Sequence, residues 1–303
     1  MNNTILITGG TGLIGSRLSY LLREQGYGVR HLSRRRNTSA EFPAYRWDID
    51  QNYIDPDAID SKVSTIVHLA GASIADCRWT TSRKAELLSS RTRGIALLST
   101  YLREQPQHQV RTFIGGSATG YYGNSGDRPM TENDPPADDS FLSQTTQAWE
   151  QAYAPLDQVR RVVLRIGVVL SAAGGALPQM ALAARWGLAT YFGKGRQYVP
   201  WIHIDDLCAL LLYVIANPAV EGTYNAVAPQ AITNAELMHI LAQTLSGRAW
   251  NVPIPAAVLR LGMGEMADVV LHGCRATSDK ICQAGFVFLY PELREAVRNL
   301  FVV

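Results

Sequence analysis

Short apolar runs alternate with longer segments of mixed polarity along most of this chain, a pattern typical of strands separated by helices. The first run, Thr4 to Thr8, is rich in β-branched residues and uncharged, which predicts a strand buried on both faces. Helices are predicted over residues 13–24, 78–103 and 141–153. Further strands are predicted at residues 29–32, 45–48, 63–69, 110–114, 162–166, 201–204 and 223–227. This order predicts an α/β fold, a Rossmann-type doubly wound parallel sheet.

The length of the chain and the positions of its prolines suggest how it is divided into domains. Its 303 residues favour one large domain with an appended part over two equal halves. We assign residues 1–228 to the Rossmann domain, with an insertion at about 171–200 that reaches over a substrate. Residues 229–303 are predicted to form a smaller, mainly helical module, interrupted where Pro253-Ile254-Pro255 breaks the chain. Because this tail lacks an evident core of its own, we expect it to pack over the edge of a ligand cleft.

The glycines after the first strand carry the clearest chemistry. Gly9 allows a tight turn, Gly12 allows a pyrophosphate to approach the backbone, and Gly15 allows the helix to lie close to the strand. The free N–H groups at the start of the helix then face the phosphates. Strand, glycine loop and helix in this order predict a dinucleotide site, and the alternative is a glycine-rich turn without a ligand.

The end of the second strand bears on which nucleotide is bound. An acidic residue at this point favours NAD, whereas an arginine accommodates the 2′-phosphate of NADP. The sequence here is Ser33-Arg34-Arg35-Arg36, which favours NADP with Arg34 best placed. The alternative is a solvated basic turn. The acid that ends the third strand, Asp48, either borders the adenine pocket or caps a turn.

Composition excludes several other classes of protein. Hydrophobic residues make up 47% of the chain and charged residues 18%, with a net charge of +2, which indicates a compact protein without a nucleic-acid-binding face. The four cysteines include no C-x-x-C pair, so we expect free thiols and no metal site. The start of the chain has no signal-peptide pattern, and the apolar run 207–216 is too short for a bilayer. We therefore expect a cytoplasmic protein that binds a small-molecule substrate, with no membrane partner.

Several blocks together resemble the extended short-chain dehydrogenase/reductases, and more narrowly their atypical, epimerase-family (nucleotide-sugar-epimerase-like) branch. The blocks span essentially the whole chain and include the glycine loop. The others are Arg78-Trp79-Thr80, Ser117-Ala118-Thr119-Gly120-Tyr121-Tyr122-Gly123, Gly167-Val168-Val169-Leu170, Gly193-Lys194-Gly195-Arg196-Gln197, Trp201-Ile202-His203-Ile204-Asp205-Asp206 and Gly264-Glu265-Met266-Ala267-Asp268. The tail resembles the family's own C-terminal module, although Thr277-Ser278-Asp279-Lys280 lacks a proline that relatives usually carry.

The resemblance implies a cofactor, NADP, and a set of residues that contact it. The pyrophosphate is expected at Thr11, Gly12, Leu13 and Ile14, and the 2′-phosphate at Ser33 and Arg34. It further implies Leu69 and Ala70 along the cofactor, with Glu86 and Arg91 contacting it from the long helix. Periodicity alone places Glu86 and Arg91 on a solvated face.

The usual acid–base pair of the superfamily is missing. Active members use a tyrosine with a lysine four residues later, and no tyrosine of this chain has that lysine. Alignment on Glu150 places Leu142 and Thr146 at those two positions. Ser117, Tyr121 and Tyr122 remain as candidate catalytic residues, with simple packing of the two rings as the alternative.

Two functions stay open on these observations. One is an NADP-binding oxidoreductase or epimerase-like protein that acts on a small or nucleotide-linked carbonyl or sugar substrate. The other is a non-catalytic, NADP-dependent binding or regulatory protein, which the missing pair favours. Arg165, Lys194 and Arg196 are possible contacts for an anionic group, while His203 and Asp205 have a structural explanation as the start of an apolar helix. The oligomeric state is left undetermined.

Overall fold

The computed structural model describes residues 3–301 and is built around one eight-stranded sheet. The strand order is β12-β8-β6-β5-β1-β2-β3-β4, and all neighbours are parallel except the short β4, which pairs antiparallel with β3. The strands are β1 Thr4–Thr8, β2 Gly28–Ser33, β3 Ala44–Asp48, β4 Tyr53–Ile54, β5 Val63–His68, β6 Thr112–Ala118, β8 Arg160–Ile166 and β12 Gly222–Ala226. The predicted doubly wound parallel sheet is confirmed.

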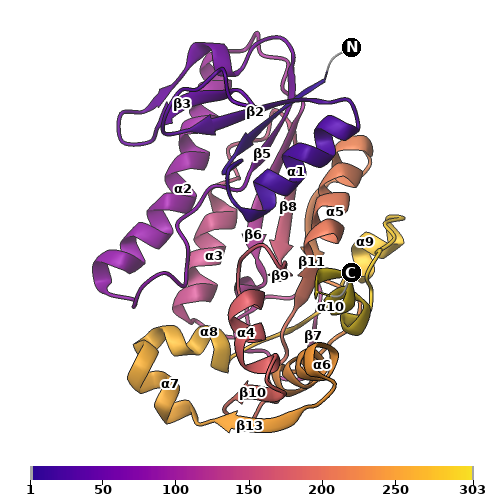
Figure 1. The fold of residues 1–303 in the computed structure, drawn as a ribbon. Coiled ribbons are helices and arrows are strands. Elements are labelled where there is room, and N and C mark those ends of the chain that lie inside the picture. Colours follow the sequence, from indigo (N-terminus) through magenta and orange to yellow (C-terminus); the bar gives the residue numbers. More distant parts are fainter. Residues whose placement is uncertain (1–2, 302–303) are drawn as a thin grey trace.

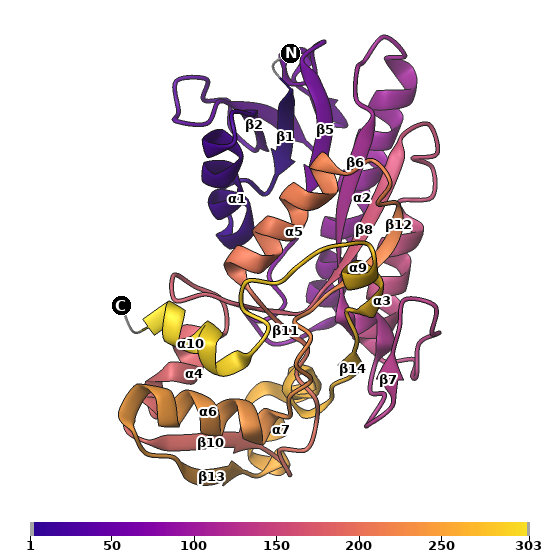
Figure 2. The ribbon, with the colours of Figure 1, turned by 90° about the vertical axis from the view of Figure 1, so that its right-hand side faces the viewer.

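Two helix layers bury the two faces of this sheet. Helices α1 (Leu13–Glu24) and α5 (Ile204–Ala216) cover one face, and α2 (Thr81–Glu104) and α3 (Phe141–Gln151) cover the other (Figures 1 and 2). Strand β1 shows why both layers are needed, because Ile5 and Ile7 pack with α1 and α5 while Leu6 packs on the opposite side with α2. An uncharged apolar strand is therefore buried on both faces, as its sequence predicts.

The long helix begins later than predicted. We expected it to open at Arg78, but α2 starts at Thr81, and the Thr80 hydroxyl accepts the N–H of Arg83 at 3.2 Å as an N-cap. Thr80 is a favourable capping residue, so the helix starts where the cap can satisfy a free N–H group. Arg78 and Trp79 consequently lie in the loop between β5 and α2.

The insertion and the tail share one structure at the carboxyl ends of the strands (Figures 1 and 2). Strand β10 (Leu188–Phe192) of the insertion pairs in parallel with β13 (Trp250–Ile254) of the tail. The expectation that Pro253 breaks the chain is wrong, because β13 has β10 as its one neighbour and an edge strand tolerates a proline. Helices α4 (Leu177–Ala184), α6 (Asn234–Ser246) and α10 (Leu293–Phe301) form one apolar cluster with β10. The proposed boundary at residue 228 stays a prediction.

Short elements connect this lower part to the sheet. Strand β9 (Val168–Leu170) pairs with β11 (Trp201–His203), and β7 (Pro129–Met130) pairs with β14 (Arg275–Ala276). The other helices are α7 Ala256–Met263, α8 Asp268–Leu271 and α9 Asp279–Gln283, and the 3₁₀ turns are η1 Pro56–Ala58, η2 Thr119–Tyr122 and η3 Gly264–Ala267. Within residues 3–301, no helix combines the length and the apolar character that a bilayer crossing requires.

Candidate functional site

The glycine loop has the geometry that a dinucleotide requires. Gly9 has a positive φ of 71°, and a Cβ there would lie 3.0 Å from the backbone of Leu69 and Ala70. At Gly15 a Cβ would lie 2.3 Å from the Gly9 carbonyl oxygen, so α1 could not approach the loop with any larger residue. Gly12 precedes the helix in an extended conformation, and no side chain caps the free N–H groups of α1. The first turn of α1 also contains no acidic residue, so this end of the helix suits an anion.

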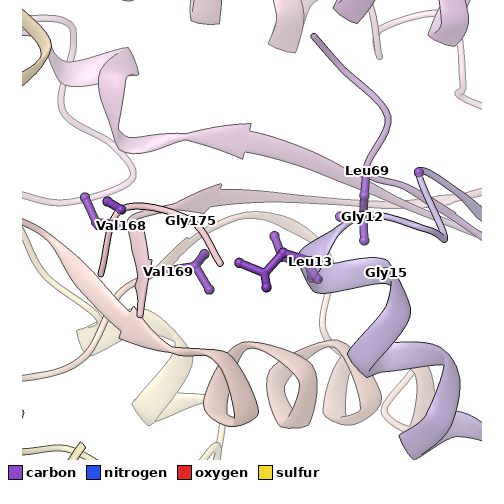
Figure 3. A pocket seen from close by; sticks show the side chains of 10 residues that line it. Gly12, Leu13, Gly15, Leu69, Val168, Val169 and Gly175 are labelled. Carbon is purple, nitrogen blue, oxygen red and sulfur yellow. The ribbon is translucent and has the colours of Figure 1, made fainter. Parts of the chain in front are cut away.

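A cleft of about 270 Å³ opens beside this loop (Figure 3). Six predicted cofactor residues line it, namely Gly9, Gly12, Leu13, Ile14, Gly15 and Leu69. The opposite wall consists of Val168, Val169, Gly175 and Ala176, and the side chain of Leu13 reaches toward Val169. Residue-by-residue prediction missed this second wall, although Gly167-Val168-Val169-Leu170 was already a family block.

Thr8, at the end of β1, fixes the chain that follows β5. Its Oγ1 accepts the N–H groups of Leu69 and Ala70, each at 3.2 Å, and lies 2.8 Å from His68 Nδ1. Leu69 and Ala70 are thereby held against the glycine loop, as the cofactor assignment requires. His68 is fully buried, and burial lowers its pKa to about 4, so this histidine is neutral at physiological pH.

Two of the three arginines after β2 are available to a ligand. Arg36 is engaged by Asp55 at 2.8 Å and by Asp57 at 2.9 Å. Arg34 and Arg35 are exposed, and within residues 3–301 neither forms an ion pair. Ser33 donates its hydroxyl to the Arg35 carbonyl, which orders the turn. This arrangement leaves Arg34 free to bind a phosphate.

The predicted residues on α2 differ in their surroundings. Arg91 is buried and donates to the carbonyls of Leu87 at 2.9 Å and Ala72 at 3.0 Å, beneath the loop that follows Ala70. No carboxylate accepts from Arg91 within the described residues, and burial lowers its pKa. Glu86 is exposed and is paired with Arg83 at 2.8 Å. The helix therefore places a buried cation next to the predicted cofactor path.

Ser117, at the carboxyl end of β6, belongs to a buried ionic cluster. Its hydroxyl donates to Glu150 Oε1 at 2.7 Å, and the same carboxylate accepts Arg165 Nε at 2.8 Å and Nη2 at 2.9 Å. The Arg165 side chain is only 4% exposed. Because the carboxylate is held by a bidentate arginine, it acts as an acceptor, and the single proton of Ser117 points at Glu150. Ser117 is thereby prevented from donating to a substrate oxygen in this arrangement.

Tyr122 is part of the same cluster, and its hydroxyl is bonded within the protein. Its side chain is fully buried, and its hydroxyl accepts Arg165 Nη1 at 2.9 Å and donates to Asn225 Oδ1 at 2.7 Å. Asn225 is oriented by donating its amide to the carbonyls of Met130 and Thr277, so the direction of these bonds is fixed. Burial raises the pKa of Tyr122 well above its ordinary value. Its burial and its hydrogen bonds support the packing alternative for Tyr122, and its catalytic role stays a prediction.

Tyr121 remains the candidate with an uncommitted hydroxyl. It is half-buried, and its ring stacks on the Arg165 guanidinium at 3.4 Å. No hydrogen bond from its hydroxyl is formed with the residues that the structure describes. Of the three candidates, Tyr121 is the one whose hydroxyl proton is not donated to another group within the described residues.

The positions of the missing acid–base pair contain no replacement chemistry. Leu142 and Thr146 lie one turn apart on α3, and Thr146 is buried. The Thr146 hydroxyl donates to the carbonyl of Leu142 at 2.7 Å, a bond within its own helix. This pair therefore cannot exchange a proton with a ligand.

The remaining polar candidates divide between framework and surface. His203 is buried and its Nδ1 accepts the N–H of Asp205 at 3.0 Å, which caps α5, while Asp205 pairs with Arg17 of α1 at 2.7 Å. This supports the structural explanation for both residues. Lys194 and Arg196 are exposed on the turn after β10, away from the glycine-loop cleft.

A mostly parallel sheet with a G-x-x-G-x-x-G loop and an uncapped helix after it defines a nucleotide-binding fold of the extended short-chain dehydrogenase/reductase type. The profile of the NAD dependent epimerase/dehydratase family matches residues 5–227, and the chain belongs to that family. A second profile, for a domain of unknown function (DUF1731), matches residues 254–300. The predicted family and its own C-terminal module are thus confirmed.

Individual relatives extend over nearly the whole chain. Epimerase family protein Mb2239 of Mycobacterium bovis is 37% identical over 303 residues, covering 98% of this chain and 97% of its own. The crystal structure of human epimerase family protein SDR39U1 (isoform 2) with NADPH is 32% identical, with a TM-score of 0.88 and 98% of both chains covered. A nucleoside-diphosphate sugar epimerase from Corynebacterium glutamicum is 29% identical with a TM-score of 0.79, covering 99% of this chain and 58% of its own.

Proposed function

We propose that this protein binds NADPH along the carboxyl edge of the sheet. The observation that carries the proposal is the cleft beside the glycine loop, where the backbone of Gly9 and Gly15 leaves no room for a Cβ and the start of α1 is uncapped. The N–H groups of Leu13 and Ile14 would hold the pyrophosphate, and Ser33 with Arg34 would hold the 2′-phosphate. Leu69, Ala70, Glu86 and Arg91 would contact the rest of the cofactor. The human relative SDR39U1 was crystallised with NADPH, which supports this choice.

NADPH supplies a hydride, so the site suits an oxidoreductase or epimerase-like reaction on a small or nucleotide-linked carbonyl or sugar compound. Tyr121 is the residue that we assign to donate a hydrogen bond or a proton to the substrate oxygen, because the protons of Ser117 and Tyr122 are committed to Glu150 and Asn225. With no lysine four residues after Tyr121, proton transfer is inefficient and turnover of simple carbonyl compounds is expected to be slow.

A second candidate is a non-catalytic protein whose loops are ordered by NADPH and then recognised by a partner. The closed cluster of Ser117, Glu150 and Arg165 favours it, because this cluster occupies the place where the family's polarising serine acts. Leu142 and Thr146, which stand in place of the usual acid–base pair, also favour the non-catalytic candidate.

Cofactor preference tests the binding proposal. NADPH is expected to bind at least about tenfold more tightly than NADH, since the 2′-phosphate gains charge-assisted bonds. Arg34→Asp should remove this preference by weakening NADPH alone, whereas the exposed Arg298→Asp on α10 should leave both affinities unchanged. Fluorescence titration of each protein with both cofactors measures this. Equal affinities in the unmodified protein would contradict the proposal.

Single-turnover oxidation of NADPH separates the two candidate functions. The traces are recorded from pH 6 to 10 with a panel of small aldehydes and ketones, for the unmodified protein, Tyr121→Phe and Tyr122→Phe. A catalytic role predicts that Tyr121→Phe slows the substrate-dependent rate and that Tyr122→Phe mainly lowers the free energy of unfolding. Traces that equal the substrate-free background in all three proteins would favour the non-catalytic candidate.

A further inference from the structure

Two motifs that lie far apart in the sequence meet at the surface of the protein. Arg78, from the Arg78-Trp79-Thr80 block, donates through Nε to the Gly262 carbonyl at 2.9 Å and through Nη2 to the Leu261 carbonyl at 3.1 Å. Lys84, at the start of α2, pairs with Glu265 of the Gly264–Asp268 block. In Figure 1, α7 and α8 lie below the first turns of α2. Arg78 thus binds the carboxyl end of α7, where free carbonyls and the helix dipole favour positive charge, and Lys84 binds the 3₁₀ turn η3 that follows.

Helix α7 depends on such contacts because it is poorly packed. None of its side chains is buried, although most are apolar, and Val258 and Leu261 are 59% and 83% exposed. The chain enters α7 from Pro255 and leaves it through Gly264, which has a positive φ of 63°. Few apolar contacts and a glycine turn at one end mark a segment that opens at low free energy.

The loop that holds α7 is continuous with the predicted cofactor loop. After Ala70, the carbonyl of Ala72 accepts Arg91 at 3.0 Å, and the carbonyl of Ser73 accepts Arg83, the partner of Glu86. The indole of Trp79 then donates to the Ile74 carbonyl at 3.0 Å and stacks edge-on against Phe141 of α3. Of the two α2 side chains that hold this loop, Arg91 is itself predicted to contact NADPH, and Arg83 is paired with Glu86, which is predicted to contact it as well.

We propose that Arg78 and Lys84 form a latch that couples the position of α7 to the cofactor loop. When Leu69, Ala70, Glu86 and Arg91 engage NADPH, the loop at residues 70–79 is held in the conformation that presents Arg78 to α7. The latched helix then forms the outer wall on the substrate side, while Lys84 also lies over the ring of Phe141, with its Nζ 5.1 Å from the ring centroid. In this arrangement Arg78 and Lys84 act as positioning residues, and the proposal rests on NADPH binding as proposed above.

The strength of the latch suits a reversible device. Lys84 is 29% exposed and Glu265 66% exposed, so their ion pair is partly screened by water. A ligand that favours the latched state shifts the population only by the difference in its affinity for the two states. A weak latch can therefore be closed by cofactor contacts with the loop and reopened when the cofactor leaves.

Amide hydrogen exchange of residues 256–263 tests the latch, with and without NADPH. Arg78→Ala is expected to raise exchange in this segment roughly three- to tenfold in the cofactor-free protein. NADPH is expected to slow exchange there in the unmodified protein and to have little effect in Arg78→Ala. Lys84→Gln should act in the same direction with a smaller effect. The control is Arg93→Ala, which removes another α2 cation, paired with Asp50 at 2.7 Å and remote from α7.

Each outcome decides the proposal. Unchanged exchange in cofactor-free Arg78→Ala would show that the latch does not hold α7. An equal effect of NADPH in Arg78→Ala and in the unmodified protein would show that coupling runs by another route. A separate fluorescence titration reports whether NADPH binds at all, so a failure of the proposed function is distinguished from a failure of the latch, which the cofactor-free comparison still tests.

Discussion

The glycine-loop end and the Ser117 end of the candidate site differ in how many of the groups that a nicotinamide enzyme needs are present and available. At the glycine loop, turn geometry, close helix packing and free N–H groups are all present, supplied by the backbone of one continuous segment. At the Ser117 end, side chains from β6, α3 and β8 meet, and they bind one another instead of an open position. A phosphate site made of backbone is therefore tied to the fold, whereas a catalytic group made of side chains can be replaced while the fold persists.

Breaking the ionic cluster should give the largest effect on stability. Glu150→Ala leaves the buried Arg165 without its carboxylate counter-ion and is expected to lower the free energy of unfolding by about 3–5 kcal/mol. NADPH affinity should stay nearly constant, because the cluster does not line the glycine-loop cleft. Urea denaturation and a cofactor titration measure the two quantities.

Two control variants accompany this experiment. The double variant Glu150→Ala/Arg165→Met removes both charges and should recover much of the loss. Asp60→Ala breaks the more exposed pair with Arg30 and should cost no more than about 1 kcal/mol. A loss of that smaller size in Glu150→Ala would show that the cluster is effectively solvated.

Lowering the pH should decrease the free energy of unfolding through the protonation of His68, which lies beneath the cofactor loop. Its pKa is lowered by burial from 6.5 to about 4, so between these values the unfolded chain binds a proton that the folded protein excludes. Stability from this histidine is complete above pH 6.5 and falls as the pH drops toward 4, by up to about 3 kcal/mol. His68→Gln should flatten this part of the curve of unfolding free energy against pH, whereas His239→Gln on α6 should not. Parallel curves for His68→Gln and the unmodified protein would exclude this cause.

A methyl group at Gly15 should disturb the glycine-loop end of the site and leave the Ser117 end unchanged. Gly15→Ala places a Cβ 2.3 Å from the Gly9 carbonyl oxygen and must push α1 away from the loop, at a cost of about 2 kcal/mol. NADPH affinity is expected to fall at least about tenfold, because the N–H groups of α1 move with the helix. Gly26→Ala is the matched control, since its φ of 81° is strained but nothing lies within 4 Å of the new Cβ. Equal NADPH affinity in the two variants would show that the close packing of α1 is not needed for the cofactor.

Local patterns predicted the sheet and the glycine loop because both depend on short-range properties of the chain. An uncharged β-branched strand such as Thr4–Thr8 is buried wherever it lies, and a glycine turn followed by a helix carries its phosphate site with it. The same reasoning failed at Pro253, where pairing with β10, about 60 residues earlier in the chain, made an edge strand out of an expected break. It also did not assign Val168 and Gly175 to the second wall of the cleft, although Val168 lies in a family block.

The order and spacing of residues were enough to predict the fold class, the family, the glycine loop and the absence of a Tyr-x-x-x-Lys pair, since each is visible along the chain. Three other features emerged only in the folded protein: Tyr122 is buried, Ser117 gives its proton to Glu150, and Arg78 reaches the end of α7. The direction of a hydrogen bond and the burial of a side chain depend on which distant segments contact each other in the folded protein. The spacing of residues along the chain does not determine those contacts.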